Sequence, residues 1–154
     1  MPSLVDIGGK IMTRTHQALF DASKGRILGK TFGMPVVKLE TTGRKTGQRR
    51  TTMLTAPVWT WVRGAGAPGG EDDRVVLVAS KGGYDKHPVW YLNLQAQPKV
   101  TVTMLGHTRD LVARTASADE KAELWPQIVA AYKGYAGYQK RTDRDIPVVI
   151  LEPA

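Results

Sequence analysis

The chain has 154 residues, 42% hydrophobic and 23% charged, which suits one globular domain and excludes a disordered chain. It has no cysteine, which excludes disulfides and thiolate metal sites, and its three histidines lack the spacing of metal ligands, so no bound metal is expected. The net charge of +8 favours an anionic partner, whether a nucleic acid, an anionic membrane surface or a phosphorylated small molecule.

Residues 1–30 are predicted to form an N-terminal amphipathic helix region. Apolar residues such as Leu4, Ile7 and Ile11 recur at helical spacing over about residues 3–24. We expect this helix to pack on the domain, and the alternative is a basic helix that rests on a membrane surface. The segment lacks the apolar run of a secretory signal, and no window approaches the ~20 apolar residues of a membrane span. We therefore expect a cytoplasmic protein, with peripheral contact to the inner face of the membrane as the alternative.

A hairpin of two strands is predicted next. Period-two alternation predicts a strand over residues 36–41, and a run rich in Thr, Val and Trp predicts the returning strand over residues 51–62. Residues 43–48 would form the wide, basic tip of this hairpin. Pro57 indicates an edge strand or a bulge, and residues 63–74 predict a surface loop because they are rich in Gly, Pro and charge.

The second half of the chain predicts four more strands and two helices. The apolar run 75–79 predicts a buried central strand, and Pro88 suits the first turn of a short helix. Residues 100–105 and 107–115 predict a second hairpin around Gly106. Ser117 and Glu120 form a capping-box signature for a helix that runs to about residue 140, with a restart at Pro126 as one interpretation. A last strand is predicted over residues 146–151.

This order of elements predicts one domain over residues 31–154, mainly β with flanking helices (α+β). Short antiparallel strands joined by hairpins indicate a small barrel with helices at its ends. Alternating β-α units are absent from the prediction, which disfavours a doubly wound dinucleotide fold.

The first candidate site is the basic hairpin. Between Lys38 and Thr51 the sequence has five basic residues and one acid, with two glycines at the tip. Glycines let backbone N–H groups approach a ligand, and Arg and Lys side chains bind phosphate oxygens. The pattern therefore predicts a phosphate-binding loop, although Gly43 and Lys45 do not have the Walker spacing. The alternative is a solvated hairpin tip.

The second candidate site follows the buried strand, where Ser80 and Lys81 precede two glycines. Such a strand end lets the backbone approach a flat ligand, and the short helix behind it carries Trp90 and Asn93. The alternative is an ordinary turn, with Trp90 and Leu94 in the core.

The third candidate site is a set of tyrosines spaced by three: Tyr132, Tyr135 and Tyr138. This spacing predicts that they lie along one side of a helix, and Gly134 and Gly137 would weaken that helix by about 2 kcal/mol together. We interpret it as a mobile segment that lays aromatic rings over a planar ligand; the alternative is a tyrosine stripe in the core. No catalytic triad, carboxylate pair or nucleophilic cysteine is evident, so an enzyme would depend on a bound cofactor.

These motifs together resemble the deazaflavin-dependent nitroreductase family, an actinobacterial group also described as F-420-dependent quinone reductases. The resemblance covers about residues 30–154 and implies a split β-barrel like that of flavin-nucleotide-binding oxidases. It implies coenzyme F-420, an 8-hydroxy-5-deazaflavin with a phosphate and a polyglutamate tail. The sequence departs from the family pattern at Met53, where many relatives have a proline, and this affects only local strand geometry.

The resemblance also implies roles for individual residues. The phosphate and tail would be held by Arg44, Lys45, Arg50, Thr51 and Lys81. The deazaflavin ring would lie against Ser80, Gly82, Gly83, His87, Pro88, Trp90 and Asn93. The catalytic group would comprise Ser80, Tyr132, Tyr135 and Tyr138, with Ser80 or a tyrosine hydroxyl polarising the oxygen of the acceptor.

The expected function is an F-420H2-dependent oxidoreductase that transfers a hydride to a small-molecule acceptor: a quinone, a nitroaromatic or an activated enone. Nucleic acid is not the expected partner, because the charge is concentrated at one turn rather than along a groove. The alternatives are a basic β-barrel nucleic-acid-binding protein, an FMN- or haem-binding protein on the same barrel, and a peripheral membrane protein.

Overall fold

The computed structural model describes residues 30–31, 33–61 and 72–154. The strands in these ranges are β1 (Lys30–Thr31), β2 (Met34–Thr42), β3 (Arg49–Thr55), β4 (Val58–Thr60), β5 (Arg74–Val78), β6 (Lys99–Met104), β7 (His107–Thr115) and β8 (Val148–Glu152). The helices are α2 (Val89–Ala96), α3 (Ala118–Ala131) and α4 (Gly134–Lys140), with a short 3-10 turn η1 (Lys81–Gly83). The predicted N-terminal helix and most of the predicted loop over residues 63–74 lie outside the described residues.

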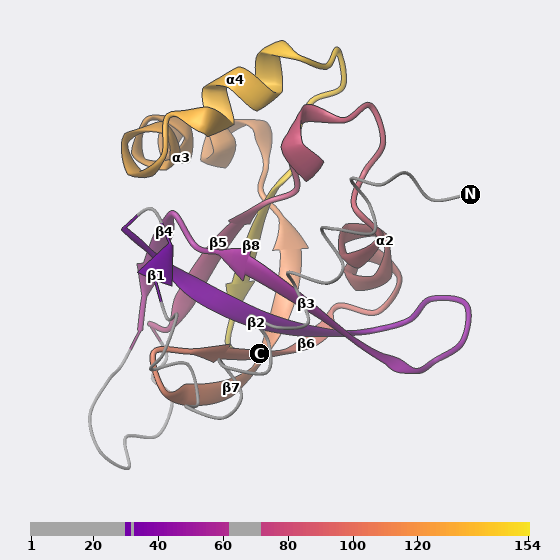
Figure 1. The fold of residues 1–154 in the computed structure, drawn as a ribbon. Helices are drawn as coiled ribbons and strands as arrows, with labels where there is room; N and C mark the ends of the chain where they lie inside the picture. Colours follow the sequence, from indigo (N-terminus) through magenta and orange to yellow (C-terminus); the bar gives the residue numbers. More distant parts are fainter. Residues whose placement is uncertain (1–29, 32, 62–71) are drawn as a thin grey trace.

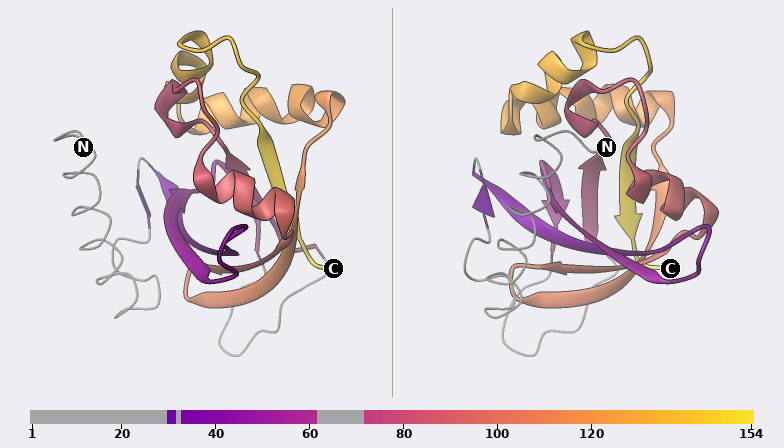
Figure 2. Two further views of the ribbon diagram at one scale, coloured as in Figure 1. Left: turned by 90° about the vertical axis from the view of Figure 1, so that its right-hand side faces the viewer. Right: turned by 45° about the vertical axis from the view of Figure 1, so that its right-hand side comes forward.

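The strands form an antiparallel sheet in the order β1-β2-β6-β7-β8-β5-β4, with β3 paired to β2. The sheet curls into an open barrel, with α3 and α4 across one end and α2 beside the strands (Figures 1 and 2). The prediction of a mainly β split barrel with flanking helices is confirmed.

Both predicted hairpins form. In the first, β2 and β3 pair from Val36 opposite Thr55 to Thr42 opposite Arg49. In the second, Met104 pairs with His107, so the turn has two residues with φ of 51° and 84°. Two successive positive φ angles are those of a type I′ turn, which matches the twist of the strands.

The segment predicted as one returning strand over residues 51–62 forms two strands. The first, β3, ends at Thr55, and the Ala56 N–H then donates to the Pro35 carbonyl at 3.0 Å. The chain resumes at Val58 in β4, which pairs with β5 at the end of the sheet. Because proline has no N–H to donate, Pro57 interrupts the ladder and lets the chain change its partner.

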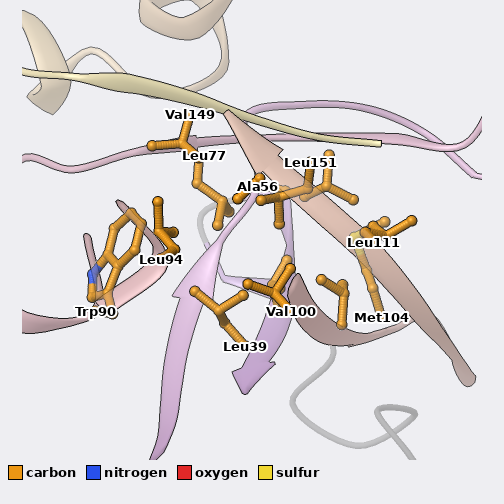
Figure 3. Close-up of a cluster of buried hydrophobic side chains, with 14 of the residues drawn as sticks. Leu39, Ala56, Leu77, Trp90, Leu94, Val100, Met104, Leu111, Val149 and Leu151 are labelled. Atoms are coloured by element: carbon orange, nitrogen blue, oxygen red, sulfur yellow. The ribbon is translucent and has the colours of Figure 1, made fainter. Parts of the chain in front are cut away.

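The core has two parts, one on each face of β5. Val75 and Leu77 point into the barrel, where α2 contributes Trp90 and Leu94 (Figure 3). Val76, on the other face, belongs to a second cluster of buried residues under α3 and α4. β5 is thus buried on both faces, as its unbroken apolar run predicted.

The helix after β7 begins as predicted and is interrupted at an unexpected place. Ser117 Oγ accepts from the Glu120 N–H at 3.2 Å, and Glu120 Oε1 accepts from the Ser117 N–H at 3.0 Å, which confirms the capping box. Glu120 also accepts a hydrogen bond from Arg114 at 2.7 Å. The Arg114 bond, followed by the bond from the Ser117 N–H, lowers the pKa of Glu120 to about 2.

The predicted restart at Pro126 is wrong. Pro126 lies inside α3 on its exposed side, and the break comes at Tyr132, whose φ of −157° is extended. The Tyr132 ring folds back over Gly134, the first residue of α4, where a Cβ would lie 2.5 Å from the ring. This packing of a ring on a glycine separates the two helices.

Candidate functional site

The basic hairpin tip is a closed turn that presents its cations to solvent. The Gly43 N–H donates to the Gln48 carbonyl at 2.7 Å, and the Gly47 N–H donates to the Gly43 carbonyl at 2.8 Å. Arg44, Lys45 and Arg50 are exposed around it. A rigid turn that carries exposed guanidinium and ammonium groups is suited to binding phosphate and carboxylate oxygens.

Asn93 of α2 holds this tip in place. Its side chain is 3% exposed, and its Oδ1 accepts from the Arg44 N–H at 3.1 Å and from Arg44 Nη1 at 3.4 Å. The resemblance places Asn93 against a cofactor ring, whereas the structure shows it anchoring the loop that carries Arg44. The contact with a ring stays a prediction.

The two arginines at the start of β3 have different surroundings. Arg49 donates to Thr42 Oγ1 at 3.0 Å and to Thr101 Oγ1 at 2.8 Å, which holds it over the outer side of the sheet. Arg50 is the next residue, so its side chain leaves the strand on the opposite face. Its Nε lies 3.6 Å from the position that a Cβ on Gly43 would take. Arg50, with the exposed Thr51 after it, therefore lies beside the tip.

The turn after β5 is held against α4. Lys81 and Gly83 have φ of 46° and 85°, and the Gly83 N–H donates to the Ser80 carbonyl at 2.9 Å. A Cβ on Gly83 would lie 2.8 Å from the Tyr138 carbonyl oxygen and 3.0 Å from Arg141 Cβ. The space beside Gly83 is thus filled by α4 and the residue after it. The exposed Lys81 and the backbone of Gly82 complete the turn.

Arg144, in the loop before β8, was not predicted from the sequence. Its Nη2 donates to the carbonyls of Ala79 at 3.1 Å and Ser80 at 2.8 Å, its Nε to the Tyr84 carbonyl at 2.8 Å, and its Nη1 to His87 Nδ1 at 3.1 Å. Burial, and then the charge of Arg144, lower the pKa of His87. Arg144 is 64 residues from Ser80, and no motif or periodicity in the sequence links them.

The residues after His87 point into the protein. Pro88 is buried and caps α2, and Trp90 is 7% exposed and packs in the core beside Leu94 (Figure 3). Trp90 thus lies in the core, as the alternative interpretation of this segment expected. The contact of Trp90 with a cofactor stays a prediction. His87 is partly exposed, with its ring 5.0 Å from that of Tyr91.

The three tyrosines form one cluster in which each ring meets the others edge to face. The ring centroids are 5.4 Å apart for Tyr132 and Tyr135, 6.3 Å for Tyr132 and Tyr138, and 6.0 Å for Tyr135 and Tyr138. The expectation of a single helical side is wrong, because Tyr132 ends α3 while the other two lie on α4. The rings meet because Tyr132 folds back over Gly134.

Tyr135 is the most buried of the three. It is 6% exposed, and its hydroxyl lies 3.2 Å from Thr55 Oγ1 and 3.9 Å from Met34 Sδ. Burial raises the pKa of Tyr135, and hydrogen bonding with Tyr132, followed by burial, raises that of Tyr138. These phenols therefore stay protonated at neutral pH, and the single O–H of Tyr135 donates to Met34 Sδ in this structure. Thr55 and Met34 were not singled out from the sequence.

Contacts join the three predicted sites into one surface. Arg44 binds Asn93 on α2, α2 begins just after His87, and Arg144 ties His87 to the turn at Ser80. The same turn packs through Gly83 against Tyr138 of α4. Figure 1 shows η1 and α2 between α4 and the protruding β2–β3 hairpin. Cationic donors lie at one end of this surface and phenols at the other, which suits an elongated ligand with an anionic tail and a flat head.

Two hollows open on the surface of the described residues. One, of about 310 Å³, lies beside η1 and is lined by Gly83, Tyr84, Asp85 and Arg141. The other, of about 390 Å³, lies between Arg49 and the outer side of β6 and β7. Across the described ranges, no three His, Asp or Glu side chains are grouped as metal ligands. No helix in the same part of the chain is long and apolar enough to cross a membrane.

Known proteins are similar to this chain in sequence and in fold. The family model described as F420H(2)-dependent quinone reductase matches residues 12–153. The F420H(2)-dependent quinone reductase Rv1261c of Mycobacterium tuberculosis is 37% identical over 148 residues, which cover 93% of this chain and 91% of that protein. The solved structure of an F420-H2 dependent reductase, FDR-A, is 39% identical with a TM-score of 0.63, covering 77% of this chain and 94% of that one. The Atu2129 protein of Agrobacterium tumefaciens, at 15% identity and a TM-score of 0.55 over 77% of this chain and 48% of that one, shares the fold alone.

Proposed function

This chain belongs to the F420H(2)-dependent quinone reductase family, and on that premise we propose that the hairpin tip holds the anionic part of coenzyme F-420 while the tyrosine cluster receives the hydride acceptor. The chain is an oxidoreductase, and F-420 is its cofactor. The observation that carries the placement is the rigid cationic tip, anchored on α2 through Arg44 and Asn93.

The donors of the tip fit the cofactor's phosphate and glutamates. Residues 43–51 contain four cations (Arg44, Lys45, Arg49 and Arg50) and no acid. A guanidinium binds a phosphate or carboxylate through two parallel hydrogen bonds, and an ammonium adds a point charge. Arg49 is bonded to two threonines, so Arg44, Lys45 and Arg50 are the proposed ligands, with Thr51 beside them and Lys81 across from them on η1.

When bound in its reduced form, F-420 supplies a hydride, and the protein contributes binding, orientation and exclusion of water. The turn from Ser80 to Gly83 and the side chain of His87 would hold the flat ring. The tyrosine cluster would exclude water from the site. The hydroxyl of Tyr135 or of Ser80 donates a hydrogen bond to the acceptor oxygen, where negative charge develops.

The acceptor is a quinone, and the proposal extends to nitroaromatics and activated enones. All three are flat and carry an electron-poor group with oxygen, which suits a site walled by aromatic rings and phenol donors. The proposed location is the cytoplasm. The net charge of +8 supports contact with an anionic membrane surface, which flotation of the full chain on anionic and on neutral vesicles tests.

The test is a titration of the purified protein with F-420. Binding is measured by the quenching of F-420 fluorescence and by calorimetry. We expect saturable binding that weakens at least tenfold in Arg50→Ala, since a hydrogen bond to a charged group contributes about 1.5–3 kcal/mol. Arg114→Ala, which removes an arginine on the far side of β7, should bind like the wild type. The reduced complex should be reoxidised by menadione and by nitroaromatics.

Absence of heat and quenching at high ligand excess would refute the proposal. The alternatives have their own signatures. Binding of single-stranded DNA with a steep salt dependence would indicate a nucleic-acid-binding barrel. A shifted absorbance spectrum with FMN or haem would indicate another cofactor on the same fold.

A further inference from the structure

The side chain of Arg144 links three parts of the proposed cofactor site. Its guanidinium donates to the carbonyls of Ala79 and Ser80 at the end of β5, to that of Tyr84 after η1, and to His87 before α2. These four contacts to separate acceptors use four of the five N–H donors of the guanidinium, more than the three that a lysine ammonium has. This one side chain therefore ties together the backbone on both sides of η1.

The contact with His87 also fixes where the imidazole carries its proton. Arginine has only donors, so the 3.1 Å contact from Nη1 requires a lone pair on His87 Nδ1. A neutral imidazole with a lone pair on Nδ1 carries its proton on Nε2. A charged imidazole would have an N–H on Nδ1, pointing at a cation.

Within the described ranges, the surroundings of His87 lower its pKa rather than raise it. The Tyr91 ring of α2 packs beside the imidazole at 5.0 Å, and burial and Arg144 both lower its pKa. Asp85, the nearest acid in sequence, accepts from Thr142 Oγ1 at 2.8 Å. The imidazole is partly exposed, so its Nε2–H can reach a ligand that lies on the turn.

We propose that Arg144 is a positioning residue: it sets the turn at Ser80 and holds His87 as the neutral Nε2–H tautomer, which donates a hydrogen bond to an oxygen of bound F-420. The inference rests on the proposed function and deepens it by adding a residue that does not itself touch the cofactor. It makes His87 a directed donor rather than only a wall of the site.

The first test needs no cofactor. The protein is labelled with ¹⁵N-histidine, and long-range ¹H–¹⁵N correlation spectra identify the protonated nitrogen of each ring, with His16 and His107 as internal references. In the wild type we expect His87 to be protonated at Nε2 and to titrate below 6.5, its ordinary value. In Arg144→Met we expect a mixture of tautomers and a rise in the pKa of His87. Arg114→Met, remote from the site, should leave the His87 signals unchanged.

The outcome of this test is decisive even if Arg144→Met fails to fold. A wild-type His87 protonated at Nδ1 overturns the proposal without any variant. So does a folded Arg144→Met, or a folded Arg144→Lys, in which the tautomer and the pKa of His87 are those of the wild type.

The second test measures what the tautomer does for the enzyme. His87→Leu removes the donor, and His87→Gln keeps an N–H near the same place. We expect kcat/KM to fall about 100-fold in Arg144→Met and in His87→Leu, as for a misplaced reacting group, and to be partly restored in His87→Gln. F-420 binding and turnover unchanged in His87→Leu would overturn the proposal. If the wild type binds no F-420, the proposed function fails, while the spectra still decide the tautomer.

Discussion

Replacing Gly83 with alanine should push α4 away from the turn at η1, and the cost has two parts. The first is backbone strain: Gly83 has a φ of +85°, and a residue with a Cβ in the left-handed region costs about 1–2 kcal/mol. The second is a clash: the new Cβ would lie 2.8 Å from the Tyr138 carbonyl oxygen and 3.0 Å from Arg141 Cβ. These atoms cannot rotate away, so overpacking adds about 1–3 kcal/mol.

Two other glycines separate the two costs. Gly33 has a φ of +78°, and no atom of the described residues lies within 4 Å of the position that a Cβ would take there, so Gly33→Ala carries the strain alone. Gly137, in α4, has no positive φ and no close neighbour in the part of the chain that the structure describes, so Gly137→Ala should stabilise the chain by up to about 1 kcal/mol. The expected order of unfolding free energies, from lowest to highest, is Gly83→Ala, then Gly33→Ala, then the wild type, then Gly137→Ala.

Thermal unfolding and acceptor kinetics together check this order. A loss of about 2–5 kcal/mol should lower Tm by roughly 10 °C in a chain of this size, and Gly33→Ala, with about 1–2 kcal/mol, should lower it about half as much. Because α4 carries two of the tyrosines, kcat/KM for a quinone should fall further in Gly83→Ala than the affinity for F-420. If Gly83→Ala unfolds together with Gly33→Ala, α4 does not pack on the turn and the reasoning is refuted.

Three further changes test other parts of the structure. Tyr135→Phe should lower kcat/KM for a quinone by about 100-fold at unchanged F-420 affinity, as when one donor to a developing oxyanion is lost; unchanged kinetics would remove Tyr135 from that role. Asn93→Leu leaves the Arg44 N–H without its acceptor, so the free energy of unfolding in urea should fall by about 1–3 kcal/mol, and F-420 should bind more weakly at unchanged kcat. F-420 affinity equal to that of the wild type would show that Asn93 does not position Arg44. In the folded protein the hydrogen bond from Arg114 is the main cause that lowers the pKa of Glu120 from 4.5 to about 2. Glu120 therefore stabilises the fold fully above pH 4.5, and this stabilisation is lost as the pH falls toward 2. Urea unfolding free energies across this range should depend less on pH in Glu120→Gln, and an equal dependence would contradict the pairing.

The parts of this protein that could be predicted from sequence are those set by neighbours along the chain. Alternation along β2, the unbroken apolar run of β5 and the Ser117–Glu120 capping box are local patterns, and each forms as expected. The basic tip was also recognisable, because its cations are adjacent in sequence. In each case the residues that decide the structure lie within one element or one turn.

The features that sequence reasoning missed depend on contacts that no local pattern indicates. The break between α3 and α4 arises where the Tyr132 ring meets Gly134, a contact without a periodicity of its own, whereas Pro126, the evident helix breaker, is tolerated on an exposed side. Arg144 acquires its role only when the loop before β8 returns to Ser80. Such a contact has no signature until the strands are in place.

The helices α3 and α4 lie in one segment, residues 116–147, between the paired strands β7 and β8, so this segment can be exchanged as a unit. β7 and β8 close its base, where Thr115 pairs with Val149 and the Ala116 N–H donates to the Val148 carbonyl at 2.8 Å. Grafting residues 116–147 from a relative should therefore transplant its acceptor preference and leave the hairpin of the host intact. Such a chimera will work only where the host turn offers a glycine at position 83 to receive the donor helix.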